Sequence, residues 1–274
     1  MVLESLITPS EVRKNSWYLF FLGIIFSSAG ILLSIYVFPG NASLFSIFLT
    51  TLAATPLFIT LLKDEELLSI NLIEKKQPIF KNNIDIISAF FFLFLGFTIS
   101  CILWFCFLPD WAFNMAFKEQ INEISAMQSV MSSNFIVSGE LLQTIIINNL
   151  RVLFFCVLFS FIYGAGSVLI LSWNASVLAT AVGLFIRDKM TADSSMVTVL
   201  LSNLPFGLGQ YMLHGTFELV AYFIGSLIGG IISASIIRKS FTNNNFFKLF
   251  KNIIFLLFIS IALIFVAGII EVSL

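Results

Sequence analysis

The chain has 274 residues, of which 59% are hydrophobic, only 11% are charged and 33 are Phe. An ordinary soluble domain has roughly a quarter of its residues charged and could not bury this much apolar surface. Lipid accepts long uncharged runs when each backbone group bonds within its own segment, which predicts an all-α polytopic membrane bundle. With a net charge of -1 and no basic patch, the expected partner is the lipid bilayer and no nucleic acid.

Apolar runs alternate with polar stretches in a single integral membrane domain over 1–274. They predict about six long transmembrane helices plus one short or re-entrant helix. In chain order the predicted elements are a cytoplasmic N-terminus (1–16), two spans (17–38 and 42–62), a cytoplasmic loop (63–83), a third span (84–107), an extracytoplasmic amphipathic segment (111–143), a fourth span (152–171), two short apolar pieces (175–186 and 196–204), a long helix (211–237) and a last span (253–270).

The piece at 175–186 leaves two alternatives open, crossing or re-entry. It follows a predicted break at Ser172, Trp173 and Asn174, and its helix would rise only ~18 Å against a hydrocarbon core of ~30 Å. If it crosses, a cytoplasmic N-terminus puts ten of the fourteen Lys and Arg residues inside. The positive-inside rule therefore favours seven crossings, with the C-terminus outside.

His214 and Glu218 are four residues apart in the long helix and share a face. Small residues at four-residue spacing continue that face: Ala221, Gly225, Gly229 and Ser233. Such spacing lets membrane helices approach closely, so the pattern predicts helix packing here.

Glu218 is an ionisable group in a span, which costs on the order of 3 kcal/mol on insertion scales. It should therefore face a partner, and Arg151 and His214 are candidates. Three roles remain open: a buried network that sets helix register, a proton or ion relay, or a position near the headgroups.

A second polar cluster surrounds the fourth span and its expected break. Broken helices are typical of secondary transporters, although the sequence shows no internal repeat. The predicted buried polar network comprises Arg151, His214, Glu218, Asn149 and Asn174, and the predicted packing positions comprise Gly164, Gly166, Ala221, Gly225, Gly229 and Ser233.

Catalytic and metal-binding patterns are not found in the sequence. Cys101, Cys106 and Cys156 lie in apolar runs without paired spacing and are expected to be small core residues. The single His lacks a neighbouring nucleophile motif and offers too few ligands for zinc. We expect no enzyme activity, no metal and no cofactor.

Several segments resemble the stage II sporulation protein M family, especially its archaeal branch. They are "LESLITPSEV" near the start, "INNLRVLFFCVLFSFIYGAGSVLILSWNASVLATAVGLFIR", "YMLHGTFELVAYFIGSLIGGIISASIIR" and the closing "AGIIE", with a family-like core over 146–274. The resemblance implies that the pattern is made by Asn149, Gly164, Gly166, Asn174, His214, Gly215, Glu218, Gly225 and Glu271. The chain departs from the family pattern at Phe217, where family members often have Pro directly before the Glu that corresponds to Glu218.

The resemblance implies a multi-pass cell-membrane protein that acts in membrane assembly. The bacterial namesake works in a complex that remodels cell-wall material during engulfment, but sporulation itself does not follow for this chain. We expect a scaffold that associates with membrane proteins or with itself. The alternative is a channel or secondary transporter with a pathway past Glu218, His214 and Arg151.

Overall fold

The computed structural model describes residues 15–74, 80–133, 138–163, 166–191, 194–237 and 246–273. Every regular element within these ranges is helical, as the composition predicts. Seven of the helices are long and apolar enough to cross a membrane, which confirms the helical membrane bundle. The predicted 1–16 N-terminus lies almost wholly outside the described residues.

The N-terminal hairpin forms as predicted. Helix α2 (Tyr18–Val37) ends before the 3-10 turn η1 (Pro39–Asn41), and α3 (Ala42–Glu74) returns along it. Helix α4 (Phe80–Phe107) packs on the other side of α2, where Gly23 lies directly against Gly96. A Cβ on Gly23 would lie 2.7 Å from the Leu93 carbonyl oxygen, so the two backbones touch.

The polar stretch at 63–83 is mostly helical, whereas a loop was expected. Helix α3 continues to Glu74 and α4 begins at Phe80, so both helices extend beyond their apolar spans. Charged side chains such as Lys and Glu are good helix formers, and a helix that leaves the membrane can continue in water. Hydropathy therefore located the end of each span and not the end of each helix.

Two helices follow α4 across the predicted amphipathic segment. Helix α5 (Asp110–Ala116) and helix α6 (Lys118–Ser133) are both helical, as expected for 111–143, and α7 (Ser138–Tyr163) begins within the same segment. Phe117, Gln120 and Ile124 are buried, while Asn122 and Glu123 are exposed. The segment thus covers one end of the bundle with its apolar face.

The break expected at residues 172–174 is absent. The predicted fourth span, 152–171, is wrong, because α7 ends at Tyr163 and its apolar stretch covers Leu141–Ile162. Helix α8 (Ser167–Asp188) is continuous over 22 residues, which at 1.5 Å per residue is about 33 Å and long enough to cross. The Ser172 hydroxyl and the Asn174 amide donate to carbonyl oxygens four residues back, each at 2.8 Å. These polar side chains are satisfied within the helix, so the 175–186 piece is the second half of a longer helix and not a separate short element.

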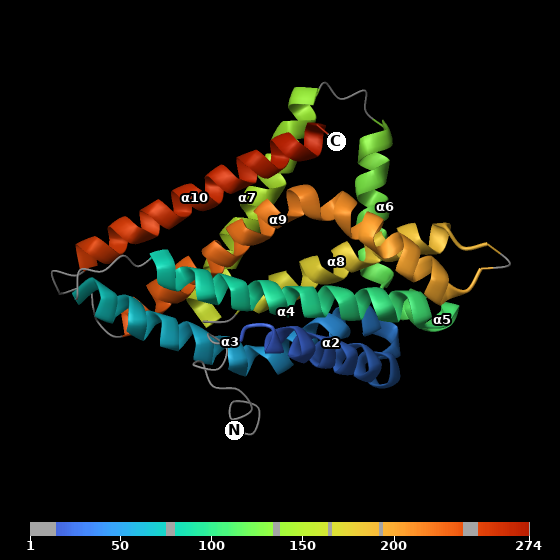
Figure 1. The fold of residues 1–274 in the computed structure, drawn as a ribbon, viewed down its shortest axis with the longest axis horizontal. Coiled ribbons are helices and arrows are strands. Elements are labelled where there is room, and N and C mark those ends of the chain that lie inside the picture. The colour runs from blue at the N-terminus through green and yellow to red at the C-terminus, as the bar shows by residue number, and fades with distance from the viewer. Residues whose placement is uncertain are drawn as a thin grey trace.

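The predicted pieces 196–204 and 211–237 form one bent helix. Helix α9 (Met196–Ile237) runs through Pro205 for 42 residues, and Figure 1 shows it changing direction part-way along. Proline removes one backbone hydrogen bond and commonly kinks a membrane helix without ending it. The last helix, α10 (Phe246–Ser273), packs against the second half of α9.

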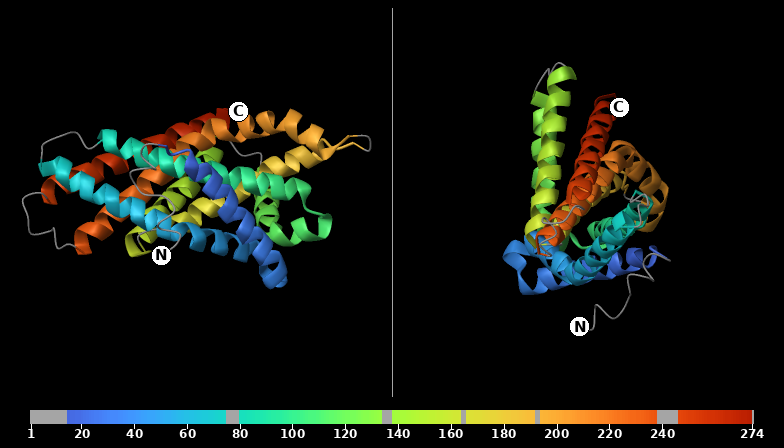
Figure 2. Two further views of the ribbon diagram at one scale, coloured as in Figure 1. Left: turned by 60° about the horizontal axis from the view of Figure 1, so that its bottom comes forward. Right: turned by 90° about the vertical axis from the view of Figure 1, so that its left-hand side faces the viewer.

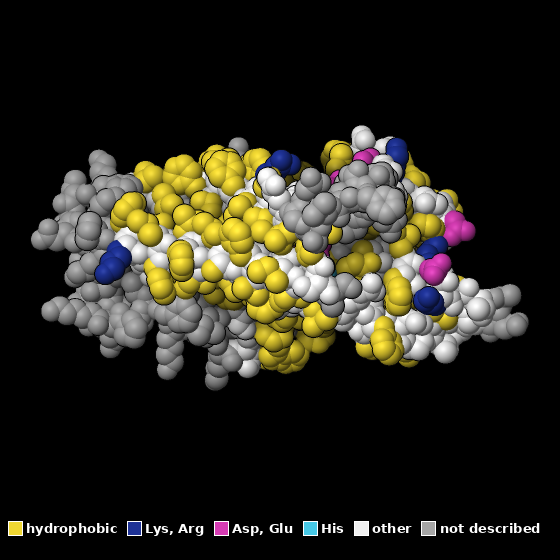
Figure 3. All heavy atoms as spheres, turned by 90° about the horizontal axis from the view of Figure 1, so that it is seen from above, with side chains coloured by type: hydrophobic (Ala, Val, Ile, Leu, Met, Phe, Trp, Pro, Cys, Tyr) yellow, Lys and Arg dark blue, Asp and Glu magenta, His cyan; other side chains and the backbone are white. Residues whose placement is uncertain are grey.

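The two halves of α9 belong to two different apolar clusters. Val199 and Leu200 pack with α4, α5 and the end of α8, while the 219–231 stretch packs with α3, α4, α7 and α10. In Figures 1 and 2 the ends of α3 and α9 and the starts of α4 and α10 gather at one end of the molecule. Figure 3 shows hydrophobic side chains over most of the described central surface, with acidic and basic groups side by side toward the other end.

Candidate functional site

The predicted polar face of α9 forms a hydrogen-bonded contact with α7. The Asn149 amide nitrogen donates to the Glu218 carboxylate, and the Tyr222 hydroxyl donates to the Asn149 amide oxygen at 2.9 Å. Asn149 and Tyr222 are buried, and Glu218 is half-buried one helical turn before Tyr222. One asparagine therefore satisfies two polar groups of the neighbouring helix, which is what a polar side chain in lipid requires.

Two further ionisable groups extend this cluster. Glu271, near the end of α10, is close enough to both Glu218 and His214 to interact with them electrostatically. Buried His214 Nδ1 has no hydrogen-bond partner among the described residues. We name Asn149, His214, Glu218, Tyr222 and Glu271 the α7–α9–α10 polar cluster.

Glycine packing holds α7 and α9 together beside this cluster. A Cβ on Gly229 would lie 2.3 Å from the Val157 carbonyl oxygen, and one on Gly225 would lie 2.6 Å from Leu153 Cδ1. The Ser160 hydroxyl donates to the Ser226 carbonyl oxygen at 2.6 Å. The small-residue face therefore lies against another helix of the same chain and is not an open surface.

The remaining predicted site residues lie elsewhere. Arg151 is exposed and does not belong to the buried network, because a residue two positions from Asn149 points about 200° away around the helix. Among the described residues, the Asn174 amide bonds only to the Ile170 carbonyl oxygen of its own helix. Of the predicted packing positions, Ala221 is buried on α9, Ser233 and Gly166 are half-buried, and Gly164 lies outside the described residues.

A second set of polar contacts, not predicted from the sequence, joins α3, α6 and α8. The Ser43 hydroxyl donates to Gln120 Oε1 at 2.7 Å, and Gln120 Nε2 donates to the Ser176 hydroxyl at 3.1 Å. Gln120 is fully buried. The available signal was the four-residue spacing of Ser172, Ser176 and Thr180, which gives α8 a polar stripe.

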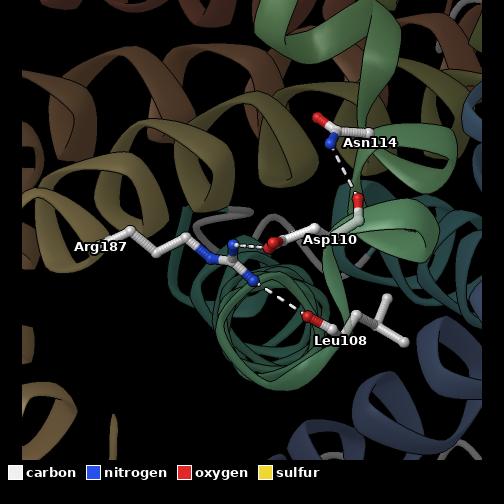
Figure 4. Close-up of polar contacts among 4 residues, drawn as sticks. All are labelled: Leu108, Asp110, Asn114 and Arg187. Carbon is white, nitrogen blue, oxygen red and sulfur yellow. Dashed lines mark hydrogen bonds and ion pairs between the residues drawn. The ribbon is translucent and has the colours of Figure 1, made fainter. Parts of the chain in front are cut away.

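Arg187 ties the end of α8 to the α4–α5 turn, which the sequence also did not predict. Figure 4 shows its guanidinium between Asp110, at 3.1 Å, and the Leu108 carbonyl oxygen, at 3.0 Å. The same guanidinium carbon lies 3.8 Å from the centre of the Phe113 ring. These contacts hold α5 against the bundle.

The described residues offer neither a metal-binding group nor an exposed thiol. Within the described ranges, no group of three or more His, Cys, Asp or Glu side chains could hold a metal ion. Cys101, Cys106 and Cys156 are free thiols and all three are buried. The site is therefore a set of interhelical contacts, with three ionisable side chains as its distinctive feature.

Comparison with known protein families identifies the chain. The profile described as SpoIIM, stage II sporulation protein M, matches residues 19–274, which is nearly the whole sequence. The chain belongs to the stage II sporulation protein M family. Its match covers all seven candidate spans but the first residue of α2, so this SpoIIM-family protein is a multi-pass membrane protein whose helices contact the lipid bilayer. No curated protein and no solved structure matches the chain.

Proposed function

We propose that this SpoIIM-family protein is a non-enzymatic scaffold that assembles with other membrane proteins in the cell membrane. Many polar side chains of its spans bond to carbonyl oxygens of their own helix, and others join helices, as in the Asn149–Glu218–Tyr222 and Ser43–Gln120–Ser176 contacts. Hydrogen bonds between helices fix their register and orientation. A bundle held in this way has a defined outer surface, which is what a scaffold needs to bind its partners.

The observation that carries the proposal is the uneven coverage of the helices. Only 22% of the α7 span and 28% of the α10 span are buried, whereas the other spans are between 39% and 61% buried. Large apolar side chains on both helices are exposed, among them Phe154 and Phe258. Helices α7 and α10 thus form the flank of the bundle that is most open to a neighbouring helix.

The orientation that we propose has a cytoplasmic N-terminus and an outside C-terminus. The end of the molecule where α3 meets α4 and α9 meets α10 carries most of the chain's basic residues by sequence position. The positive-inside rule places that end in the cytoplasm. The 111–143 segment then lies outside, where its amphipathic helices can rest on the membrane surface.

Transport remains the second candidate because of one specific observation. Three ionisable groups, His214, Glu218 and Glu271, gather within the spans, and His214 Nδ1 has no hydrogen-bond partner among the described residues. Ionisable groups inside spans are typical of ion and proton pathways. Arg151 is exposed on the side of α7 that faces away from this cluster, so it does not extend the pathway.

The variant Glu218→Gln distinguishes the scaffold from the transporter, and Asp188→Asn, at an exposed carboxylate, is the matched control. The tagged protein is cross-linked in its native membrane and its neighbours are identified by mass spectrometry, and the purified protein is tested for ion flux in liposomes. We expect reproducible neighbours for wild type, fewer for Glu218→Gln, and no flux from either. Flux that depends on Glu218, from a protein that captures no neighbour, would replace the scaffold with a transporter.

A further inference from the structure

Arg151 is placed where a membrane protein rarely keeps an uncompensated charge. It lies in the middle of the α7 span, Leu141–Ile162, whereas the other basic residues inside spans, Arg187 and Lys251, lie near span ends. Its side chain is exposed, and no described residue forms a hydrogen bond or an ion pair with it. A charge in this position is costly in lipid, which favours a counter-charge from outside the chain.

The residues around Arg151 form a continuous outward face. Ile147, Phe154 and Phe155 are four before, three after and four after it, so all four share one side of the helix, and all are exposed. We name these four residues the α7 outer face. The inward side of the same turns carries Asn149, Leu153 and Cys156, which are buried.

We infer that the α7 outer face binds a transmembrane helix of another protein, with a carboxylate of that helix against Arg151. The planar guanidinium matches a carboxylate with two parallel hydrogen bonds, and both charges are then neutralised away from water. Phe154, Phe155 and Ile147 supply the packing surface around the pair. Arginine and aromatic side chains are the residue types that contribute most to protein interfaces.

A second copy of this chain is a poor fit for that partner. The acidic residues inside the candidate spans are Glu218, Glu271 and Asp188. Glu218 accepts from Asn149, Glu271 acts on His214 and Glu218, and Asp188 is the last residue of α8. Glu218 and Glu271 of a second copy would have to leave their own cluster, and Asp188 lies at the end of a span and not at its middle.

A lipid headgroup is also disfavoured. Ten residues separate Arg151 from the start of the span and eleven from its end, which is about 15 Å of helix axis on either side. An arginine can extend toward the headgroups from near the end of a helix, but the middle of the span is the least favourable place for that. A carboxylate on an adjacent helix meets the charge where it lies.

This inference rests on the proposed scaffold function, and photo-cross-linking tests it. A photoreactive amino acid replaces Phe154 on the α7 outer face or, as the matched control, exposed Phe48 on α3. Both are introduced into the full chain with Arg151, Arg151→Gln or Arg151→Lys, in native membranes. We expect position 154 alone to capture a distinct membrane protein, with capture reduced at least about tenfold by Arg151→Gln and less by Arg151→Lys.

The decisive result is a reciprocal charge exchange. Arg151→Glu should abolish capture, and replacing the partner's intramembrane Asp or Glu by Lys should restore it. Because Arg151 is exposed and forms no hydrogen bond or ion pair with a described residue, the thermal midpoint of each variant should match wild type, and a matching midpoint excludes misfolding.

Other outcomes separate the two proposals. Capture of a partner that is unchanged in Arg151→Gln, or capture only of lipid or of a second copy at position 154, overturns the inference and leaves a scaffold acting through another face. If neither position 154 nor whole-protein cross-linking captures a partner, the scaffold proposal fails as well.

Discussion

At the scale of single residues, Asn149 is the clearest example of a polar side chain whose position in the fold explains its presence. It lies in an apolar span, yet its amide group joins Glu218 and Tyr222 of α9. Each of these groups would otherwise be left without a partner in a water-poor environment. Interhelical hydrogen bonds in membranes are individually modest, so the value of Asn149 lies in satisfying two groups at once.

Replacing Asn149 by Leu should therefore destabilise the protein. Two interhelical hydrogen bonds are lost and two polar groups are left unpaired, and we expect a loss of about 1–3 kcal/mol in unfolding free energy. Asn174→Leu is the control, because the Asn174 amide bonds only within α8 and its loss should cost less than about 0.5 kcal/mol. Unfolding in mixed detergent micelles measures both, and equal effects would contradict the role given to Asn149.

At the scale of helices, the α7–α9 contact depends on how closely two backbones approach. Gly229 faces backbone atoms of α7, which cannot move without moving the helix, whereas Gly225 faces the tip of the flexible Leu153 side chain. The same residue type therefore has different tolerance one turn apart. Sequence spacing alone treats these two glycines as equivalent.

Replacing Gly229 and Gly225 by Ala should have different effects on stability. Gly229→Ala is expected to destabilise the protein by about 1–3 kcal/mol, because the added Cβ forces α9 away from α7. Gly225→Ala should cost less than about 1 kcal/mol, since Leu153 can change rotamer. Gly215→Ala, where the added Cβ meets nothing within 4 Å, should be neutral or slightly stabilising. Thermal unfolding in detergent ranks the three, and a Gly225→Ala protein less stable than Gly229→Ala would contradict the packing described.

The α5 helix depends on a different tie, the Arg187 guanidinium. Arg187→Ala removes the bonds to Asp110 and to the Leu108 carbonyl oxygen together with the contact to the Phe113 ring. We expect a loss of about 1–3 kcal/mol in stability. Asp110 is largely exposed, so Asp110→Ala should cost less than about 1 kcal/mol. Limited proteolysis near residues 108–117 reports the release of α5, and equal cleavage of both variants would show that the ion pair alone holds it.

At the scale of the whole molecule, the number of crossings decides on which sides of the membrane the two ends of the chain lie. If each of the seven candidate spans crosses, the number is odd and the ends lie on opposite sides. The length of α8 is decisive here, because a 175–186 piece that re-entered without crossing would leave both termini on the same side of the membrane. A continuous 22-residue helix removes the reason to expect re-entry.

Cysteine labelling tests the proposed orientation. Met190, just after α8, and Ile236, near the end of α9, are both exposed, whereas the three native cysteines are buried and should give little background. A membrane-impermeant thiol reagent added to intact cells should label Met190→Cys and should label Ile236→Cys only after permeabilisation. The reverse pattern would invert the topology, and labelling of both from outside would show that α9 does not cross.

The sequence by itself determined the properties that depend on summed local chemistry. Hydropathy and length were enough for the helical membrane class, for the α2–α3 hairpin and for the third span, because lipid accepts only long apolar segments with internally bonded backbones. The cost of an ionisable group in lipid was enough to predict that Glu218 needs a partner. Asn149 was already a candidate for the same network, although Tyr222 was not.

Only the tertiary structure decided which groups meet. Ser172 and Asn174 were expected to break a helix, but they bond to carbonyl oxygens in the preceding turn and α8 continues. Arg151 and Asn149 are two residues apart, yet one faces outward and the other faces α9. The side of a helix that becomes buried depends on neighbours that come from distant parts of the chain, and that information is not contained in the local pattern of polar and apolar residues.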